Sequence, residues 1–144
     1  MKLLPPPPSS SAVTKAMKSN KSKNTRPELI FRKELRKIGL DEYTLHPRNV
    51  IGRPDIAYPK KRVAIFVHGC FWHRCPKCKL TIPKTHTEYW REKFRRNIKR
   101  DKKNKTELRS SGWKVFEFWE CDVKKDPFIL AKSVRKYFRN YDNR

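Results

Sequence analysis

The sequence predicts an α/β fold in which helices flank a small mixed central sheet. Segments with apolar residues at helical spacing alternate with short apolar segments of strand length, and one of these, residues 63–67, is apolar throughout. With 36% hydrophobic and 12% aromatic residues in the chain, the roughly 120 residues that follow the N-terminal segment can close one modest core. We therefore expect a single domain over residues 25–144.

The N-terminal segment differs in composition from the rest of the chain. Residues 1–24 are rich in Pro, Ser and Lys, contain no acidic residue and show no sustained apolar period, so little burial would offset the entropy of ordering them. We expect a disordered extension over residues 1–16 and a basic arm over residues 17–24 that orders on phosphate. Because prolines directly follow residues 1–4, no secretory signal is expected, and the predicted location is cytoplasmic.

The domain is predicted to begin with a helix from Thr25 to about Ile38. The run Thr25-Arg26-Pro27-Glu28 has the pattern of a capping box, with Thr as N-cap, Pro in the first turn and Glu reaching back from the third helical position. Apolar residues recur at helical spacing between Phe31 and Ile38, and Gly39 can adopt the left-handed conformation that ends a helix.

A strand hairpin is predicted next. Residues 43–46 and 55–58 have the character of short strands, and residues 59–62 that of a turn. Residues 63–67 have the character of a strand in the middle of a sheet, covered on both faces. The hairpin brings the end of this last strand back beside the start of the 55–58 strand.

A long basic helix follows the hairpin. A second Thr-x-x-Glu box at Thr85 and Glu88 predicts its start, and Gly112 predicts its end after about Ser110. Nine of the fifteen residues in the range 91–105 are Lys or Arg. The predicted inward stripe, which includes one carboxylate among apolar positions, consists of Trp90, Phe94, Ile98, Asp101 and Leu108.

The C-terminal part is predicted as a strand followed by a helix. Residues 113–119 form the strand, and Asp126-Pro127 caps the helix. The apolar positions of this final helix are Leu130, Val134, Tyr137 and Phe138. In a layered fold with this order of elements, a functional site is expected where the strand ends converge.

The charge of the chain indicates a polyanionic partner. With 37 Lys and Arg against 14 Asp and Glu, the formal net charge is +23, and nucleic acid is the first candidate. Ribosomal and histone-like proteins share such a charge, so it indicates binding and no particular reaction. A membrane partner is not expected, because the sequence has no long apolar run and no basic amphipathic helix with a wide apolar face.

Residues 68–78 concentrate metal-binding and aromatic side chains. They contain three of the four cysteines, two of the four histidines and an adjacent Phe-Trp pair. Cys70, Cys75 and Cys78 have the short spacing typical of zinc ligands, and Cys121, just after the last predicted strand, can complete a closed tetrahedral site. In a reducing compartment, metal ligands or free thiols are favoured over disulfides. The alternative is that Cys121 is an ordinary buried thiol.

Asp55 is a candidate ligand for a second kind of metal. It follows Gly52-Arg53-Pro54 at the start of a predicted strand, where an Asp is commonly a turn residue that bonds its own backbone. The hairpin, however, places Val67 and His68 beside it. A carboxylate at such a strand end can bind a hard cation.

Several segments, taken in chain order between about Met17 and Cys121, resemble the very short patch repair (Vsr) endonuclease family. They are Gly52-Arg53-Pro54-Asp55, residues 63–73, residues 87–93, Asn97, Arg100-Asp101, residues 112–115 and Trp119-Glu120-Cys121. The resemblance implies a restriction-endonuclease-like core of the PD-(D/E)xK type with a structural zinc site. It also implies an endonuclease that uses magnesium to cut one strand of double-stranded DNA beside a T:G mismatch.

The resemblance assigns roles to the residues that match the family's motifs. Asp55 and the backbone carbonyl of Val67 are the implied magnesium ligands, and His73 is the implied general base, supported by Asp101. An imidazole titrates near neutral pH, and a neighbouring acid fixes its tautomer. Two further residues are implied to lie around water bound to the metal, namely His68 and Glu28.

The resemblance also implies how the DNA is held. A T:G pair stacks less well than a matched pair, so aromatic side chains can separate it from its neighbours at a lower cost. The implied wedge consists of Phe71, Trp72 and Trp90, and the other implied DNA-binding residues are Lys93, Asn97 and Arg100.

The chain departs from the family in two places. It has Cys75 and Cys78 where familiar members place a His and then a Cys, which gives a zinc site of thiolates alone. Val67 replaces a hydroxyl residue found in some members, which a backbone ligand tolerates.

Simpler interpretations remain open for several of these residues. Glu28 can be a capping residue alone, His68 a histidine satisfied within the sheet, Trp90 a core residue, and the lysines of residues 91–105 a solvated face. Two alternative functions also remain open: a related nicking or restriction-type nuclease without T:G specificity, and a non-catalytic, zinc-stabilised DNA-binding module. A monomer is expected in each case.

Overall fold

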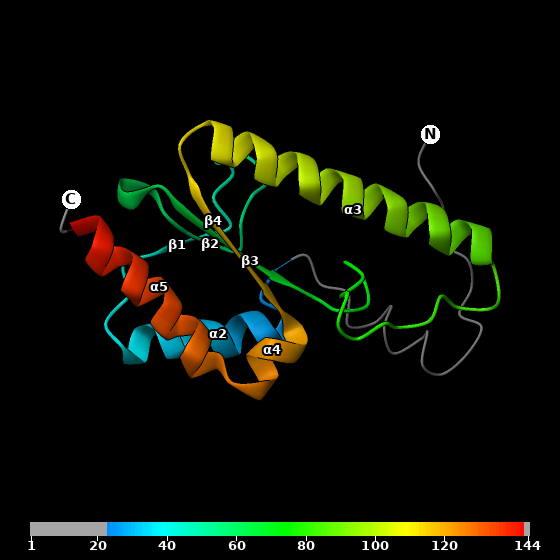
Figure 1. The fold of residues 1–144 in the computed structure, drawn as a ribbon, viewed down its shortest axis with the longest axis horizontal. Coiled ribbons are helices and arrows are strands. Elements are labelled where there is room, and N and C mark those ends of the chain that lie inside the picture. Colours follow the sequence, from blue (N-terminus) through cyan, green and yellow to red (C-terminus); the bar gives the residue numbers. More distant parts are fainter. Residues whose placement is uncertain (1–22, 143–144) are drawn as a thin grey trace.

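The structure, a computed structural model, describes residues 23–142 of the chain (Figure 1). The helices and strands are α2 (Arg26–Lys37), β1 (Thr44–Leu45), β2 (Ile56–Tyr58), the 3-10 helix η1 (Pro59–Lys61), β3 (Val63–His68), α3 (Thr87–Ser110), β4 (Lys114–Trp119), α4 (Glu120–Lys125) and α5 (Pro127–Asp142). The predicted extension, residues 1–16, and residues 17–22 of the predicted arm lie outside the described residues.

The four strands form one mixed sheet in the order β1-β2-β3-β4. The β1–β2 and β2–β3 pairs are antiparallel, whereas β3 and β4 are parallel, with His68 opposite Trp119 at the end of the pair. Strand β3 lies inside the sheet and is almost wholly buried, as its uninterrupted apolar run predicted. The predicted α/β class and mixed sheet are confirmed, and the turn before β3 is closed by Arg62 in the left-handed conformation, at φ 52°.

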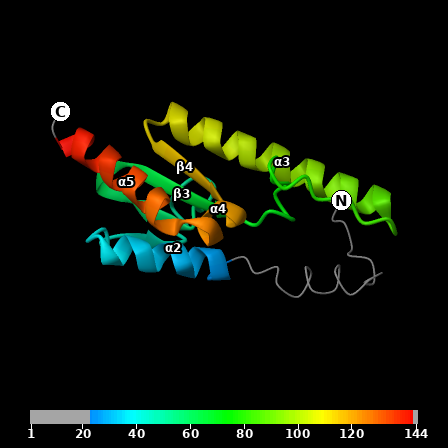
Figure 2. The same cartoon turned by 60° about the horizontal axis from the view of Figure 1, so that its bottom comes forward.

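Helices cover both faces of the sheet. Helices α2 and α5 pack on one face and α3 on the other (Figure 2). Because alternate residues of a strand point to opposite faces, Val63 and Ile65 of β3 join the larger core with α2 and α5, and Ala64 joins a smaller core with Leu108 of α3. None of the helices between residues 23 and 142 has the length and apolar character that crossing a membrane requires.

Two predictions about α3 are wrong. The helix begins at Thr87, after His86 in the left-handed conformation, so the Thr-x-x-Glu box at Thr85 does not cap it. Ile98, predicted to face inward, is 48% exposed, while Asn97 is 6% exposed in its place. The N-terminal half of α3 extends beyond the sheet over the loop that follows β3 (Figure 1), so Asn97 faces this loop and donates to one of its carbonyls, while Trp90 and Phe94 pack on the aromatic ring of Phe71 in the same loop.

The chain between β4 and α5 forms a helix that the sequence analysis did not identify. Helix α4 is six residues long, which is too short to show an apolar period. It carries Cys121 in its first turn and directs it toward the loop after β3. The final helix begins as predicted, with the N–H of Ile129 donating to Oδ1 of Asp126 at 3.2 Å.

Candidate active site

A cleft of about 820 Å³ lies where the end of β3, the loop after it and the middle of α3 meet. Most of the predicted site residues line it, namely Asp55, Val67, His68, Phe71, Trp72, His73, Lys93, Asn97, Arg100 and Asp101. Glu28 and Trp90 are 0% and 1% exposed and lie behind its wall. The fold therefore brings the predicted carboxylates, imidazoles and aromatic rings to one place.

The hairpin between β2 and β3 positions Asp55. Its register pairs Ile56 with Ile65, and two residues further along β3 the N–H of Val67 donates to Oδ2 of Asp55 at 2.7 Å. The side chain of Asp55 is 20% exposed. Burial raises the pKa of Asp55 to about 7, the hydrogen bond from Val67 opposes this shift, and the nearby carboxylate of Glu28 adds to it. Ionising this carboxyl group therefore costs free energy, and the positive charge of a bound cation would offset that cost.

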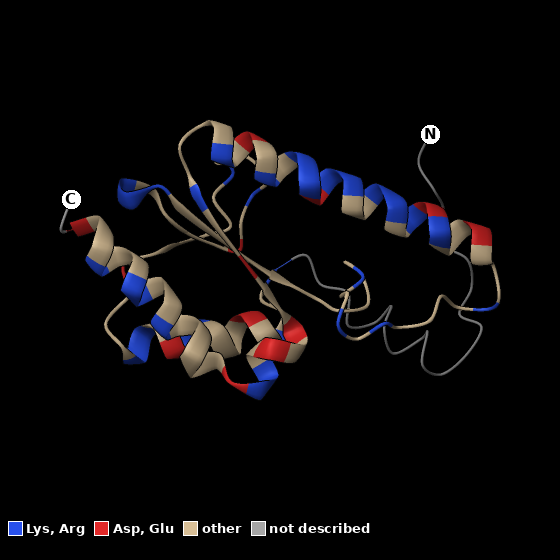
Figure 3. Cartoon of the chain, in the orientation of Figure 1, with Lys and Arg blue, Asp and Glu red and all other residues tan. Residues whose placement is uncertain are grey.

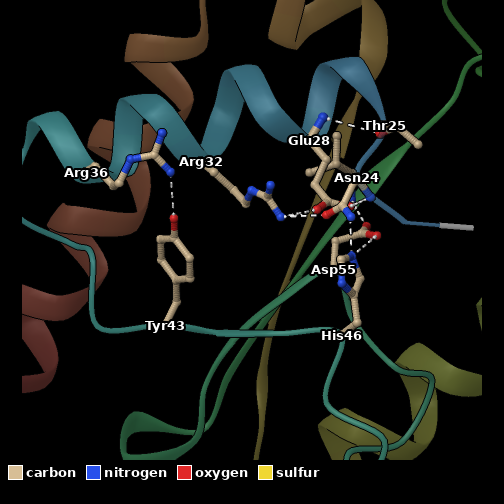
Figure 4. A network of polar contacts seen from close by, with 9 residues as sticks. Asn24, Thr25, Glu28, Arg32, Arg36, Tyr43, His46 and Asp55 are labelled. Carbon is tan, nitrogen blue, oxygen red and sulfur yellow. Dashed lines mark hydrogen bonds and ion pairs between the residues drawn. The ribbon is translucent and has the colours of Figure 1, made fainter.

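Glu28 does more than cap α2 (Figure 4). The N–H of Glu28 donates to Oγ1 of Thr25 at 3.3 Å, as in a capping box, but its own carboxylate accepts from the N–H of Asn24 at 3.2 Å rather than from that of Thr25. The same carboxylate contacts Arg32 at 2.8 Å and Nε2 of His46 at 2.9 Å. A fully buried carboxylate needs such partners, and these connect α2 to the cleft.

His46 is a site residue that the sequence analysis did not identify. Its N–H donates to the carbonyl of Asp55 at 3.3 Å, because β1 pairs with β2, and its Nε2 lies 4.0 Å from Oδ1 of Asp55. In Figure 4 its ring points toward the carboxylates of both Asp55 and Glu28. Ligand atoms of these three residues lie within 4.8 Å of one another. The signal in the sequence was a histidine at the end of an edge strand opposite the aspartate.

Two histidine–carboxylate pairs lie side by side, and all of their residues except Glu117 line the cleft. Nδ1 of His73 lies 2.6 Å from Oδ2 of Asp101, and Nε2 of His68 lies 2.9 Å from Oε2 of Glu117. The two imidazole rings are 4.3 Å apart between centroids. Burial favours a higher pKa for Asp101, but the hydrogen bond and charge of His73 hold the pKa below its ordinary value. Sequence reasoning did not identify Glu117.

The predicted wedge residues belong to one aromatic cluster. The ring of Phe71 contacts that of Trp72 at 5.1 Å and that of Trp90 at 5.7 Å between centroids. Phe71 and Trp72 are partly exposed and line the cleft, whereas Trp90 supports them from within the core. Nδ2 of Asn97 donates to the carbonyl of Trp72 at 3.1 Å, so a polar residue of α3 fixes this part of the loop.

The four cysteines form one cluster. Their Sγ atoms lie within 4.8 Å of one another, and those of Cys75 and Cys121 are 3.8 Å apart. Four thiolates around zinc, with Zn–S bonds of about 2.3 Å, place their sulfur atoms about 3.8 Å apart, so this donor set fits a tetrahedral zinc site. An ion pair between Lys77 and Asp122 also connects the loop to α4. The ligands that the sequence predicted from two distant segments thus lie together.

Positive charge is concentrated on α3. Lys and Arg positions, blue on the ribbon in Figure 3, follow one another along most of the helix. Lys93 and Arg100 line the cleft, and Lys105 contacts Glu117 at 2.7 Å. The basic helix therefore borders the cluster of histidines and carboxylates, where it can neutralise phosphate.

Comparisons with known proteins agree with this arrangement. The family model described as DNA mismatch endonuclease Vsr matches residues 9–80, half of the chain. The type II nicking enzyme V.NmeAIP of Neisseria meningitidis serogroup A is 44% identical over 105 residues, which cover 72% of this chain and 73% of that protein. The type II nicking enzyme V.NmeDIP of Neisseria meningitidis serogroup C is 40% identical over 128 residues, covering 88% and 85%.

A third relative carries the family's own name. The DNA mismatch endonuclease Vsr of Escherichia coli K12 is 41% identical over 73 residues, which cover 51% of this chain and 47% of that protein. These matches agree with the motifs in the sequence and with the α/β architecture of the structure. The chain therefore belongs to the DNA mismatch endonuclease Vsr family, and the prediction of an endonuclease is confirmed.

Proposed function

We propose that this protein is a magnesium-dependent endonuclease that nicks one strand of double-stranded DNA beside a T:G mismatch. The observation that carries the proposal is one cleft in which a carboxylate at a strand end, two histidine–carboxylate pairs and partly exposed aromatic rings meet. The names of the relatives support nicking and mismatch recognition. A core of the restriction-endonuclease-like type is proposed with it, since the sheet and flanking helices are compatible with such a core.

Asp55 and the backbone carbonyl of Val67 are the proposed ligands of the cation. The N–H of Val67 binds Oδ2 of Asp55, which leaves Oδ1 for a hard cation that prefers oxygen donors. A magnesium ion there would supply positive charge against the charge that develops on the phosphate. Next to Asp55, the ring of His46 contacts the carboxylate of Glu28 at 2.9 Å and lies 4.0 Å from that of Asp55.

His73 is the proposed general base. With Nδ1–H donating to Asp101 at 2.6 Å, Nε2 of His73 is the nitrogen that can accept a proton from the attacking water. The ionised Asp101, whose pKa is held low, fixes this tautomer and stabilises the imidazolium that forms.

Phe71 and Trp72 are the proposed wedge, and Trp90 is its support. Separating a base step costs a few kcal/mol, and the cost is lower at a mispaired step. Stacking on the two rings and phosphate contacts from Lys93, Arg100 and the other cations of α3 offset it.

Zinc is the proposed structural metal, held by Cys70, Cys75, Cys78 and Cys121. It would join the loop after β3 to α4 at the end of the parallel strand pair. The same loop carries Phe71, Trp72 and His73, so zinc would fix the wedge and the base in one rigid segment.

The proposal is tested on labelled duplexes that differ at a single base pair. Purified protein with magnesium is expected to nick the T:G duplex in one strand and to leave the matched duplex and other mismatches uncut. A protein that binds T:G duplexes in magnesium without cutting them would contradict the proposal. Equal nicking of matched and T:G duplexes would instead indicate a nicking enzyme without T:G specificity, which the names of the type II relatives favour as the second candidate.

Replacing Trp72 by alanine is expected to weaken recognition of the mismatch. Loss of one stacked ring should lower the rate of T:G nicking by about 10–100-fold, which corresponds to about 1–3 kcal/mol. Binding to matched duplex should change little, because the phosphate contacts of α3 remain. Single-turnover rates on T:G duplex measure the effect. The control is Phe128→Ala, which removes an exposed aromatic ring of α5, and equal loss in both variants would argue against a wedge.

A further inference from the structure

Glu117 is a partly buried carboxylate at the functional end of the sheet that the proposed mechanism does not use. It lies on β4 opposite Phe66 of β3, on the face of the sheet where Val115 is buried against α3. Its side chain is 23% exposed. A carboxylate in an otherwise apolar strand position is costly unless it is paired.

Both partners of Glu117 contact the same oxygen. Oε2 lies 2.9 Å from Nε2 of His68 and 2.7 Å from Nζ of Lys105. The hydrogen bond from His68, and then that from Lys105, lower the pKa of Glu117 to about 2 although burial opposes the shift. The carboxylate is therefore ionised at working pH, and an ionised carboxylate is an acceptor without a donor.

Because Glu117 can only accept, the nitrogen that faces it must carry a proton. We propose that Glu117 is a positioning residue that holds His68 as its Nε2–H tautomer, leaving Nδ1 as the acceptor nitrogen in the cleft. This inference rests on the proposed function, in which His68 lies beside the scissile phosphate. By the same argument, Nδ1 of His73, which lies 2.6 Å from Oδ2 of Asp101, would carry a proton and leave Nε2 as the acceptor, which is the opposite tautomer.

Helix α3 supports both histidines. Asp101 and Lys105 are four residues apart and so lie on the same face of the helix. Asp101 binds His73 directly, and Lys105 acts on His68 through Glu117. The ring centroids are 4.3 Å apart, with the ring planes tilted by 35°, so two neighbouring imidazoles would be held in opposite tautomers by Asp101 of α3 and by Glu117, which Lys105 of α3 contacts. The DNA-binding helix is thereby coupled to the orientation of both rings.

The test combines two variants with a spectroscopic signature of the tautomer. Glu117→Gln keeps an oxygen that can accept from Nε2–H, and Glu117→Leu removes the acceptor. Two-bond ¹H–¹⁵N spectra of protein labelled at histidine distinguish Nδ1–H from Nε2–H, and the signal of His68 is assigned by its loss in His68→Asn. Single-turnover nicking of T:G duplex, duplex affinity and melting temperature are measured for each protein.

We expect the Nε2–H tautomer at His68 in the unmodified protein and in Glu117→Gln, and a mixture of tautomers in Glu117→Leu. Loss of a residue that orients a site group typically costs about 10–100-fold in activity, so Glu117→Leu should lose about that much in nicking rate at unchanged duplex affinity, and Glu117→Gln should recover most of it. The matched control is Glu107→Leu, which changes an exposed carboxylate of α3 that is 46% exposed.

Three results would overturn the inference: an Nδ1–H tautomer at His68 in the unmodified protein, an unchanged tautomer in Glu117→Leu, or a lower melting temperature in Glu117→Leu with no change in the nicking rate. Failure of the proposed function gives a different result, in which the unmodified protein does not nick T:G duplex at all. The spectra then still decide whether Glu117 sets the tautomer.

Discussion

Replacing Asp55 by asparagine is expected to lower the rate of T:G nicking by at least about 10³-fold, since the cation's contribution is several kcal/mol. Asparagine has no charge to hold a hard cation, but its side-chain oxygen can still accept the N–H of Val67, which lies 2.7 Å from Oδ2 in the structure. The hairpin should therefore stay folded, and binding to duplex through α3 should be retained.

Single-turnover nicking in magnesium measures this effect, with duplex affinity measured in parallel. The matched control is Asp41→Asn, which removes an exposed carboxylate between α2 and β1. A variant at position 55 that nicks at more than a tenth of the normal rate would show that Asp55 does not hold a cation needed for the reaction. It would favour a non-catalytic role for this end of the hairpin.

The same variant gives a stability measurement that does not depend on activity. In the folded protein the pKa of Asp55 is about 7, above its ordinary value of 3.8. As the pH rises between these two values, the carboxyl group of Asp55 ionises in the unfolded chain before it ionises in the folded one. The free energy of unfolding therefore falls over this pH range. Above pH 7 this penalty is complete. Without divalent cations, Asp55→Asn should thus raise the melting temperature at pH 8 and leave it nearly unchanged near pH 4.

The sequence predicts those parts of the site that depend on local pairing. The hairpin follows from apolar runs around a turn, and it alone places Asp55 beside Val67. The pairing of His73 with Asp101 was predicted from the resemblance to a family. These residues are 28 positions apart, and no local sequence pattern connects them. The four cysteines proposed to bind zinc could be grouped from the sequence because the chain has four cysteines and three are closely spaced.

The residues that were not identified have partners that only the tertiary structure supplies. The sequence predicts the strand that contains Glu117 but gives this residue no role, because its partners come from β3 and α3. His46 becomes significant only when β1 pairs with β2. The error at Ile98 has the same origin, because a helical period shows which residues share a face but not how far the sheet extends beneath them.

Replacing Cys121 by serine is expected to cause the largest loss of stability. Cys121 is the one cysteine outside the loop of residues 70–78, so its loss would remove the proposed zinc link between that loop and α4. Structural zinc contributes directly to folding, and a loss of about 3 kcal/mol in a domain of this size would lower the melting temperature by on the order of 10 °C. The zinc content measured by metal analysis should fall from one zinc per chain in the unmodified protein toward zero in Cys121→Ser.

A matched control separates loss of metal from loss of stability. Val123 is fully buried on the same helix, so Val123→Ala should destabilise the protein by removing apolar contacts while zinc stays at one per chain. If the unmodified protein contains no zinc, the cluster is a set of ordinary thiols, and if Cys121→Ser keeps its zinc, Cys121 is not one of the ligands. The expected result has a consequence for activity, because His73, Phe71 and Trp72 lie in the loop that zinc would hold. Cys121→Ser should then lose nicking at temperatures where it is still folded, whereas Val123→Ala should not.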